Sequence, residues 1–289
     1  MRTGKATPWL YLLPALLMLA AFLIIPTLST VYLSFFGPRS EVFVGFQNYL
    51  QAFTSHSMLI AFRNNLLWLV VFTAFTVGVG LALAVLLDRV RYEVVIKSIV
   101  FLPMAISSVA AGIIWKFMYA FRPAYARQIG LLNAIVVALG GEPVGWLIER
   151  PWVNNLALIA VGIWMWTGFC TVIFSAAYKG IPREMLEAAR IDGANEWQVF
   201  LHITVPFLKS TIAVVTTTMV VFVLKVFDIV YVMTNGSFDT EVVANRMYKE
   251  MYSYQNYGLA SAIAVILLLA IIPFVVINVR RFRAQEAVR

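Results

Sequence analysis

The chain has 289 residues, of which 62% are hydrophobic and only 12% are charged. Soluble domains carry about 25% charged residues, so this composition excludes an ordinary soluble protein and indicates an integral membrane protein. The formal net charge is +8. We expect no nucleic acid partner, because the basic residues follow the pattern of a membrane topology. The single cysteine, Cys170, excludes an internal disulfide.

Six apolar runs are predicted to cross the bilayer. Each has about 20 residues or more, which is enough for a hydrocarbon core of roughly 30 Å. Backbone groups in lipid have no water partners, so uninterrupted runs of this length favour helices. In chain order the predicted spans cover residues 9–36, 64–87, 98–120, 152–177, 210–234 and 258–279. The predicted fold class is therefore all-α, with one polytopic transmembrane domain over residues 1–289.

Two apolar stretches need separate interpretation. The first span begins close to Met1, but it is longer than the core of about 7–15 residues in a secretory signal, so we expect it to be retained. The stretch from Leu131 to Leu139 is too short to cross a membrane. We predict a short helix there, at the outer surface.

The distribution of Lys and Arg predicts the orientation. Of the 22 such residues, thirteen fall on the side that holds both termini and seven on the other side. Cytoplasmic loops carry an excess of Lys and Arg. We therefore expect both termini, and the polar segment at residues 178–209, to face the cytoplasm.

That polar segment separates the fourth and fifth spans and is unusually long, since most connections have about 4–6 residues. Glu184 and Glu187 suit the opening turns of a helix, where the helix dipole favours negative charge. Gly193 then ends or bends the helix. A second short helix is predicted near Glu196 to His202, ended by Pro206 before the fifth span. The result is a cytoplasmic helix-turn-helix.

Two interpretations of this helix-turn-helix stay open from the residues alone. Its small side chains would let it seat in a groove of another protein, with Glu187 available for an ion pair. Alternatively, it is an amphipathic helix that rests on the lipid surface.

A few residues inside the spans are candidates for a solute pathway, because charges within a membrane are costly and often functional. Lys225 and Asp228 stand three apart on the predicted fifth helix, so they would share a face and could pair. Trp166 offers a flat face for stacking on a solute ring, and Thr217 offers a hydroxyl. Each also has a structural interpretation, as packing, interface anchoring or snorkelling toward the surface.

We expect no catalytic residue and no metal site. The chain lacks His-Glu-x-x-His and G-x-S-x-G, and its two histidines, His56 and His202, are predicted on opposite sides of the membrane. A self-sufficient secondary carrier would leave the polar segment unexplained, and no internal repeat of spans is evident. A channel would leave it unexplained as well.

The polar segment matches the motif E-A-A-x3-G-x9-I-x-x-P of the permease subunits of binding-protein-dependent ABC importers. Its fixed positions are Glu187, Ala188, Ala189, Gly193, Ile203 and Pro206. Asp192, directly before Gly193, resembles the D-G-A form of the carbohydrate branch, which includes maltose, α-glucoside and glycerol-3-phosphate permeases. Ser210 stands where a further proline is common. The stretches at residues 43–49, 228–236 and 257–264 also resemble sugar permeases.

The resemblance implies a multi-pass protein of a bacterial or archaeal cytoplasmic membrane that is not itself an enzyme. In this family the bent loop is a coupling helix, which docks on a separate cytoplasmic ATPase that its glutamate can contact. The chain has no phosphate-binding loop, so the partner would bind ATP and no cofactor is expected here. The other implied partners are a second homologous permease and an extracytoplasmic solute-binding protein.

The resemblance also implies a sugar substrate, with a di- or oligosaccharide such as an α-glucoside favoured. A glycerol-3-phosphate or other polyol permease of the same type is the alternative.

Overall fold

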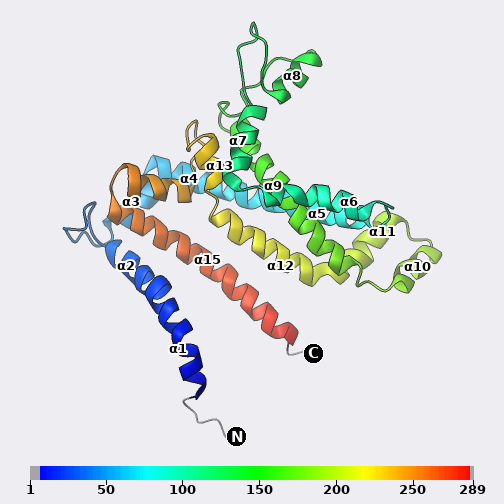
Figure 1. Ribbon diagram of the computed structural model, residues 1–289, viewed down its shortest axis with the longest axis horizontal. Coiled ribbons are helices and arrows are strands. Elements are labelled where there is room, and N and C mark those ends of the chain that lie inside the picture. Colours follow the sequence, from blue (N-terminus) through cyan, green and yellow to red (C-terminus); the bar gives the residue numbers. More distant parts are fainter. Residues whose placement is uncertain (1–6, 287–289) are drawn as a thin grey trace. The chain divides into compact units, whose positions relative to one another are not determined.

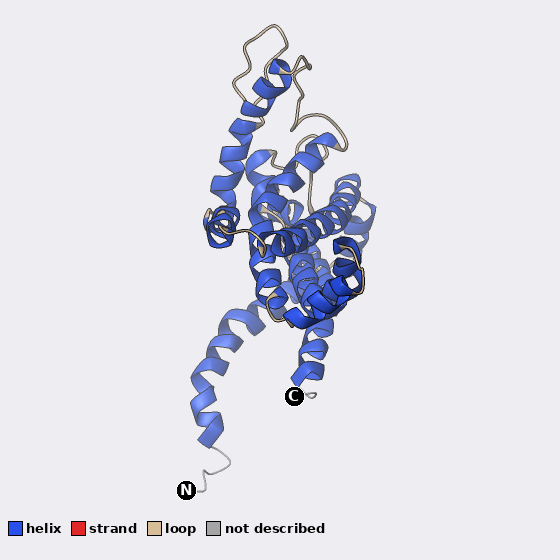
Figure 2. Ribbon diagram, turned by 90° about the vertical axis from the view of Figure 1, so that its right-hand side faces the viewer, coloured by secondary structure: helices blue, strands red, loops and turns tan. Residues whose placement is uncertain are grey.

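The computed structural model describes residues 7–286, and all the regular elements in this range are helices (Figure 2). The described residues hold five helices that are long and apolar enough to cross a membrane, or six when one bent pair is counted as a single span. The all-α polytopic fold class is thus confirmed. The two termini, which are predicted to face the cytoplasm, lie outside the described residues.

The chain divides into two compact units. The first is formed by Met1–Leu59 with Arg246–Leu269, and the second by Ile60–Asn245 with Ala270–Arg289. The elements of the first unit are α1 (Thr7–Leu19), η1 (Ala20–Ile24), α2 (Ile25–Leu33), α3 (Gln47–Thr54) and η5 (Lys249–Ser253). Three helices run from one unit into the other, namely α4 (His56–Leu67), α14 (Val243–Tyr248) and α15 (Tyr257–Glu286).

In the first unit, two of the segments that resemble sugar permeases meet each other. The Asn48 side chain donates hydrogen bonds to the backbone oxygens of Ser34 and Phe36, at 2.8 and 2.7 Å. Gly258 packs against the same backbone, since a Cβ at this position would lie only 1.9 Å from the Phe36 oxygen. These residues therefore hold the start of α15 against the connection that follows α2.

The second unit is built around α9 (Val153–Tyr178), which is apolar on nearly all sides, as expected for a buried helix. About 56% of its apolar stretch is buried. The helices α5 (Thr73–Leu87), α6 (Glu93–Phe101) and α12 (Val205–Leu224) pack along it (Figure 1). The largest fully buried side chains of this core include Trp68, Phe72, Leu158, Phe174 and Met219.

The predicted third span, residues 98–120, is not one straight helix. Helix α6 continues through a short 3-10 turn, η3 (Leu102–Ala105), and then α7 (Ser108–Met118) sets off at an angle of 101°. Pro103 has no backbone N–H to continue the helix, and the Ser107 side chain accepts a hydrogen bond from the Ala110 amide to start the next one. A proline followed by a capping serine therefore breaks the span.

The short helix predicted near Leu131 is confirmed as α8 (Leu131–Ala138). It is fastened by Asn133, which is fully buried. The Asn133 amide donates to the backbone oxygens of Ala120 and Val144, at 3.1 and 3.0 Å, and its oxygen accepts from the Trp146 indole at 3.1 Å.

Close packing of α9 on α6 leads to a test. A Cβ on Gly168 would lie 2.3 Å from the Val100 oxygen and 2.6 Å from the Phe101 Cα, whereas a Cβ on Gly78 of α5 would meet nothing within 4 Å. Overpacking of this kind costs about 1–3 kcal/mol. We expect Gly168→Ala to lower the thermal stability of the detergent-solubilised protein and Gly78→Ala to leave it unchanged. Equal melting temperatures for the two variants would contradict this packing.

Candidate coupling site

The polar segment between α9 and α12 forms two helices that meet at a corner. The first is α10 (Arg183–Ile191), and the second is α11 (Glu196–Val199), which continues through the π-turn η4 (Phe200–Thr204) into α12. Both lie at one end of the second unit, beside the ends of α5 and α9 (Figure 1). The helix-turn-helix predicted from the sequence is therefore present.

Backbone hydrogen bonds fix the first half of the corner. The amide of Ala194 donates to the Ala189 oxygen at 3.0 Å, and the amide of Gly193 donates to the Arg190 oxygen at 3.1 Å. This pair of bonds is the Schellman pattern that closes a helix. It requires a left-handed residue, and Gly193 has a φ of +87°. The glycine that the sequence singles out is thus required by the backbone geometry.

A capping box fixes the second half of the corner. The Asn195 side chain accepts from the Gln198 amide at 2.9 Å, and the Gln198 side chain accepts from the Asn195 amide at 2.8 Å. Reciprocal bonds of this kind satisfy two amides that a helix start otherwise leaves unpaired. Between Arg190 and Gln198 the direction of the chain is therefore fixed by side-chain and backbone contacts within the segment.

The motif residues fall into two groups. Glu187, Ala188, Asp192, Gly193 and Pro206 are exposed. Ala189 and Ile203 are half-buried, and together with Asp192 and Gly193 they line an open hollow of about 400 Å³. The exposed group is available to another molecule, and the half-buried group supports the corner.

Pro206 does not end the second helix, contrary to the prediction. It lies in the first turn of α12, and the helical segment runs on from Glu196 to Leu224. The π-turn at Phe200–Thr204 directly precedes it. A proline cannot donate the usual backbone hydrogen bond and clashes with the preceding turn, and a local π-turn can absorb that change without breaking the helix.

Charged side chains connect the corner to the turn between α5 and α6. Glu196 accepts hydrogen bonds from both Arg89 and Arg190, with 2.9 Å between Arg190 Nε and Glu196 Oε1. The hydrogen bond that Arg89 donates to the Glu196 carboxylate raises the pKa of Arg89 above its ordinary value. A second carboxylate, Glu93 at the start of α6, pairs with Lys97 and Lys179. Sequence reasoning had used these basic residues only to orient the chain.

The two charges predicted on one helical face, Lys225 and Asp228, lie instead on either side of a break. Helix α12 ends at Leu224, and α13 (Asp228–Met233) begins after it. Lys225 is therefore at a helix C-terminus and Asp228 at a helix N-terminus, where the helix dipoles favour their charges. The spacing of three residues does not place them on a common face, because the helix is not continuous.

The other two pathway candidates are tied to the core. Thr217 is buried, and its hydroxyl donates to the Ala213 oxygen of its own helix at 2.7 Å. The ring of Trp166 packs against Phe222, with centroids 4.5 Å apart. Its indole nitrogen is buried without a hydrogen-bond partner among the described residues. Of the four candidates, Lys225 and Asp228 have exposed side chains, and Trp166 is half-buried.

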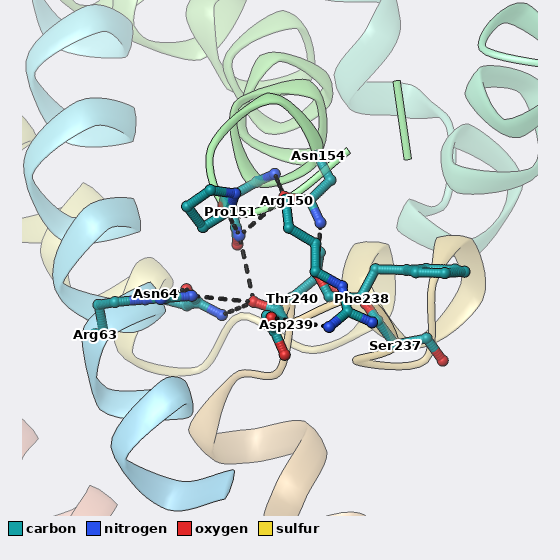
Figure 3. A network of polar contacts seen from close by, with 10 residues as sticks. Arg63, Asn64, Arg150, Pro151, Asn154, Ser237, Phe238, Asp239 and Thr240 are labelled. Carbon is teal, nitrogen blue, oxygen red and sulfur yellow. Dashed lines mark hydrogen bonds and ion pairs between the residues drawn. The ribbon is translucent and has the colours of Figure 1, made fainter. Parts of the chain in front are cut away.

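At the opposite end of the second unit, a polar network holds the loop that follows α13 (Figure 3). The backbone oxygen of Asp239 accepts from the side chains of Asn64, Arg63 and Asn155, at 2.7, 3.3 and 3.4 Å. The Asp239 carboxylate pairs with Arg150 at 3.3 Å. The sequence does not indicate this network, because its members lie in the second half of α4, around the start of α9 and in a distant loop.

Residues 74–283 of the chain match the family of the binding-protein-dependent transport system inner membrane component. This match covers well over half of the chain. The chain belongs to that permease family. It is therefore a permease of a binding-protein-dependent ABC importer, a multi-pass component of the inner membrane that is itself non-catalytic.

Relatives of this permease are named for the uptake or transport of solutes. The chain is 64% identical to the osmoprotective compounds uptake permease protein GgtC of Synechocystis sp., over 97% of this chain and 100% of the relative. It is 48% identical to the alpha-glucoside transport system permease protein AglF of Rhizobium meliloti, over 94% of this chain and 81% of the relative.

Solved structures of ABC transporters share the fold of this permease. A chain from the crystal structure of a bacterial importer of the acidic polysaccharide alginate superposes with a TM-score of 0.81, over 95% of this chain and 94% of that one. Its sequence identity is 23%, so the likeness concerns the fold.

The corner of the permease provides a structural test at Gly193. A Cβ at this position would meet nothing within 4 Å, so a substitution acts only through its left-handed backbone. A β-branched valine resists this conformation, whereas asparagine tolerates it. We expect Gly193→Val to speed hydrogen exchange at the backbone amides of residues 193 and 194. Gly193→Asn should leave these two amides protected. Equal exchange in both variants would contradict the assigned closure of α10.

Proposed function

We propose that α10 and α11 of this permease dock on a separate ATPase subunit in the cytoplasm and pass its movement to the membrane spans. The exposed Glu187, Ala188 and Asp192 beside a fixed corner are the observation that supports this proposal. Coupling between distant sites needs an element whose two arrangements make different contacts, and a stiff lever suits this requirement. The permease would pair with a second homologous permease and receive its solute from an extracytoplasmic binding protein.

The surface of α10 favours docking on a protein. Met185 and Ile191 are 48% and 86% exposed on α10, which also carries four charged residues. Both apolar side chains are therefore available to a protein partner. An interfacial helix on lipid would bury the same side chains in the headgroup region. The two interpretations differ in whether Glu187 finds a basic partner, so a charge reversal at this residue separates them.

Replacement of Glu187 by lysine tests the docking. We expect Glu187→Lys to reduce ATP-driven uptake roughly 5- to 150-fold, the range typical of a lost coupling interaction. Uptake of labelled solute and the amount of ATPase that co-purifies with the permease are the measurements. The matched control is Glu142→Lys, a charge reversal at an exposed glutamate of the loop after α8.

Membrane levels of both variants should equal the wild-type level, because neither side chain is buried. Normal uptake and normal co-purification with Glu187→Lys would rule out docking through this residue.

For the solute, we propose a sugar of the di- or oligosaccharide class, such as an α-glucoside. This assignment is supported by the relative named for α-glucoside transport, which is 48% identical over nearly the whole chain. An osmoprotective compound is the second candidate, on the name of the relative that is 64% identical. A glycerol-3-phosphate or other polyol remains the alternative that the sequence motifs leave open. Binding of a panel of these solutes to the cognate binding protein separates the three.

We propose that the break between α12 and α13 lines the solute pathway, with Lys225 and Asp228 at its edges and Trp166 and Thr217 deeper in the core. Irregular backbone at membrane depth is tolerated where it lines a water-filled cavity or is buried in protein. Exposed charges at such a break fit a hydrated pathway.

Variants at the break test this pathway. We expect Lys225→Met and Asp228→Asn to raise the solute concentration needed for half-maximal uptake, by roughly 10- to 150-fold for one lost charged hydrogen bond. ATPase co-purification should not change. Arg122→Met is the control, because Arg122 is exposed in the loop after α7. Unchanged concentration dependence in both variants would remove these side chains from the pathway.

A further inference from the structure

The coupling corner is joined by the chain itself to only two of the helices around it. Helix α9 leads into α10, and α11 leads into α12. Helices α5 and α6, which pack along α9, are joined to each other by a short turn at residues 88–92. A movement of the corner is therefore passed to α9 and α12 through the backbone. It is passed to the α5–α6 pair only through non-covalent contacts.

Glu196 is placed to make that contact. It is the first residue of α11, and its carboxylate is shared by Arg89 of the turn and Arg190 of α10. The partly exposed side chains make each single ion pair weak in water. A carboxylate held by two guanidinium groups is a small network with defined geometry, since planar guanidinium groups bind carboxylates in a fixed orientation.

Hollows lie on both sides of this contact. A polar hollow of about 630 Å³ separates the turn from α10 and is lined by Arg89, Glu93, Glu187 and Glu196, among others. An apolar hollow of about 500 Å³ lies between α5 and the start of the second helical segment, and Arg89 and Glu196 line it too. Close packing is interrupted on either side, so the ion pairs bridge a gap between the corner and the turn.

A second bridge anchors the same turn to α9. Glu93 follows the turn and pairs with Lys97 of its own helix and with Lys179 just after α9, at 2.8 Å for Lys179. Lys97 also donates to the Ser175 hydroxyl on α9. The side chains of Glu93 and Lys97 are only 17% and 14% exposed. The turn is thus held firmly to α9, and Glu196 reaches the turn from the corner through its ion pair with Arg89.

We propose that Glu196 and Arg89 are positioning residues that transmit the movement of the coupling corner to the α5–α6 pair. With the contact in place, the corner, the turn and α9 move as one body. Without it, the ATPase still docks and still hydrolyses ATP, but the corner turns about its links to α9 and α12, and the body of α5, α6 and α9 follows only in part. This inference rests on the proposed docking of α10 on an ATPase.

The test measures coupling rather than assembly. In the reconstituted transporter, with its ATPase, binding protein and second permease, we expect Glu196→Gln and Arg89→Ala to lower the solute transported per ATP hydrolysed. The expected loss is roughly two- to thirtyfold, the range found when coupling residues are replaced. Arg91→Ala is the matched control, because Arg91 is exposed in the same turn and makes none of these contacts. ATPase co-purification should equal wild type in all three variants.

A rescue experiment separates transmission from folding. The double variant Arg89→Cys/Glu196→Cys places two thiols at the contact, and the native Cys170 is buried away from reagents. A short, reducible bifunctional thiol crosslinker should restore the transport-to-hydrolysis ratio of this variant, and reductant should abolish it again. A variant that is merely misfolded would not recover in this reversible way.

The outcomes are distinguishable. If Glu196→Gln transports normally while Glu187→Lys does not, the transmission role is wrong and the docking proposal stands. If the crosslinked protein stays uncoupled, the contact does not act as a fixed bridge, and the inference is overturned. If Glu187→Lys also transports normally, the docking proposal itself fails.

Discussion

The fixed corner between α10 and α11 is the constraint on which the rest of the structure depends. Outside the membrane, a helical segment of nine residues has little stability of its own. The Schellman closure at Gly193 and the capping box at Asn195 satisfy the backbone groups where the two helices meet. The corner therefore keeps its shape without a partner, and its small exposed residues present a preformed surface.

The corner can transmit a movement only if the helices connected to it are rigidly packed. Helix α9 supplies that stiffness, because glycines and large aromatic residues pack it closely against its neighbours. At the far end, three side chains converge on the Asp239 oxygen and hold the loop that follows α13 (Figure 3). The interruptions lie elsewhere, at the bend before α7 and at the break after Leu224. Rigid packing along α9 and irregular backbone beside it are consistent with a helical body that moves around a solute pathway.

Much of this arrangement could be predicted from residues that act locally. Apolar runs predict the spans, and Gly193 predicts the end of α10, since both depend on a few neighbouring residues. The bend of the third span was missed although Pro103 and Ser107 are present, because a proline inside an apolar run is compatible with a straight, kinked or broken helix. The continuation past Pro206 was missed for the same reason.

The contacts between distant residues could not be predicted. Arg89 and Glu196 are 107 positions apart, and nothing in either segment specifies the other. The prediction that Lys225 and Asp228 share a helical face is wrong for a different reason. It assumed one continuous helix, and the structure interrupts the helix between these two residues. The single transmembrane domain over residues 1–289 stays a prediction. The roles of the motif residues stay predictions as well, because those roles depend on partners outside the chain.

Site-directed crosslinking from Ala188 tests the docking of the corner most directly. Ala188 is exposed on α10 next to Glu187, and the native Cys170 is buried, so a cysteine at position 188 reacts selectively. In membranes that hold the assembled transporter, a thiol-to-amine crosslinker on Ala188→Cys should join the permease to its ATPase in high yield. Crosslinks that reach only lipid or other permease chains would contradict docking of this corner on an ATPase.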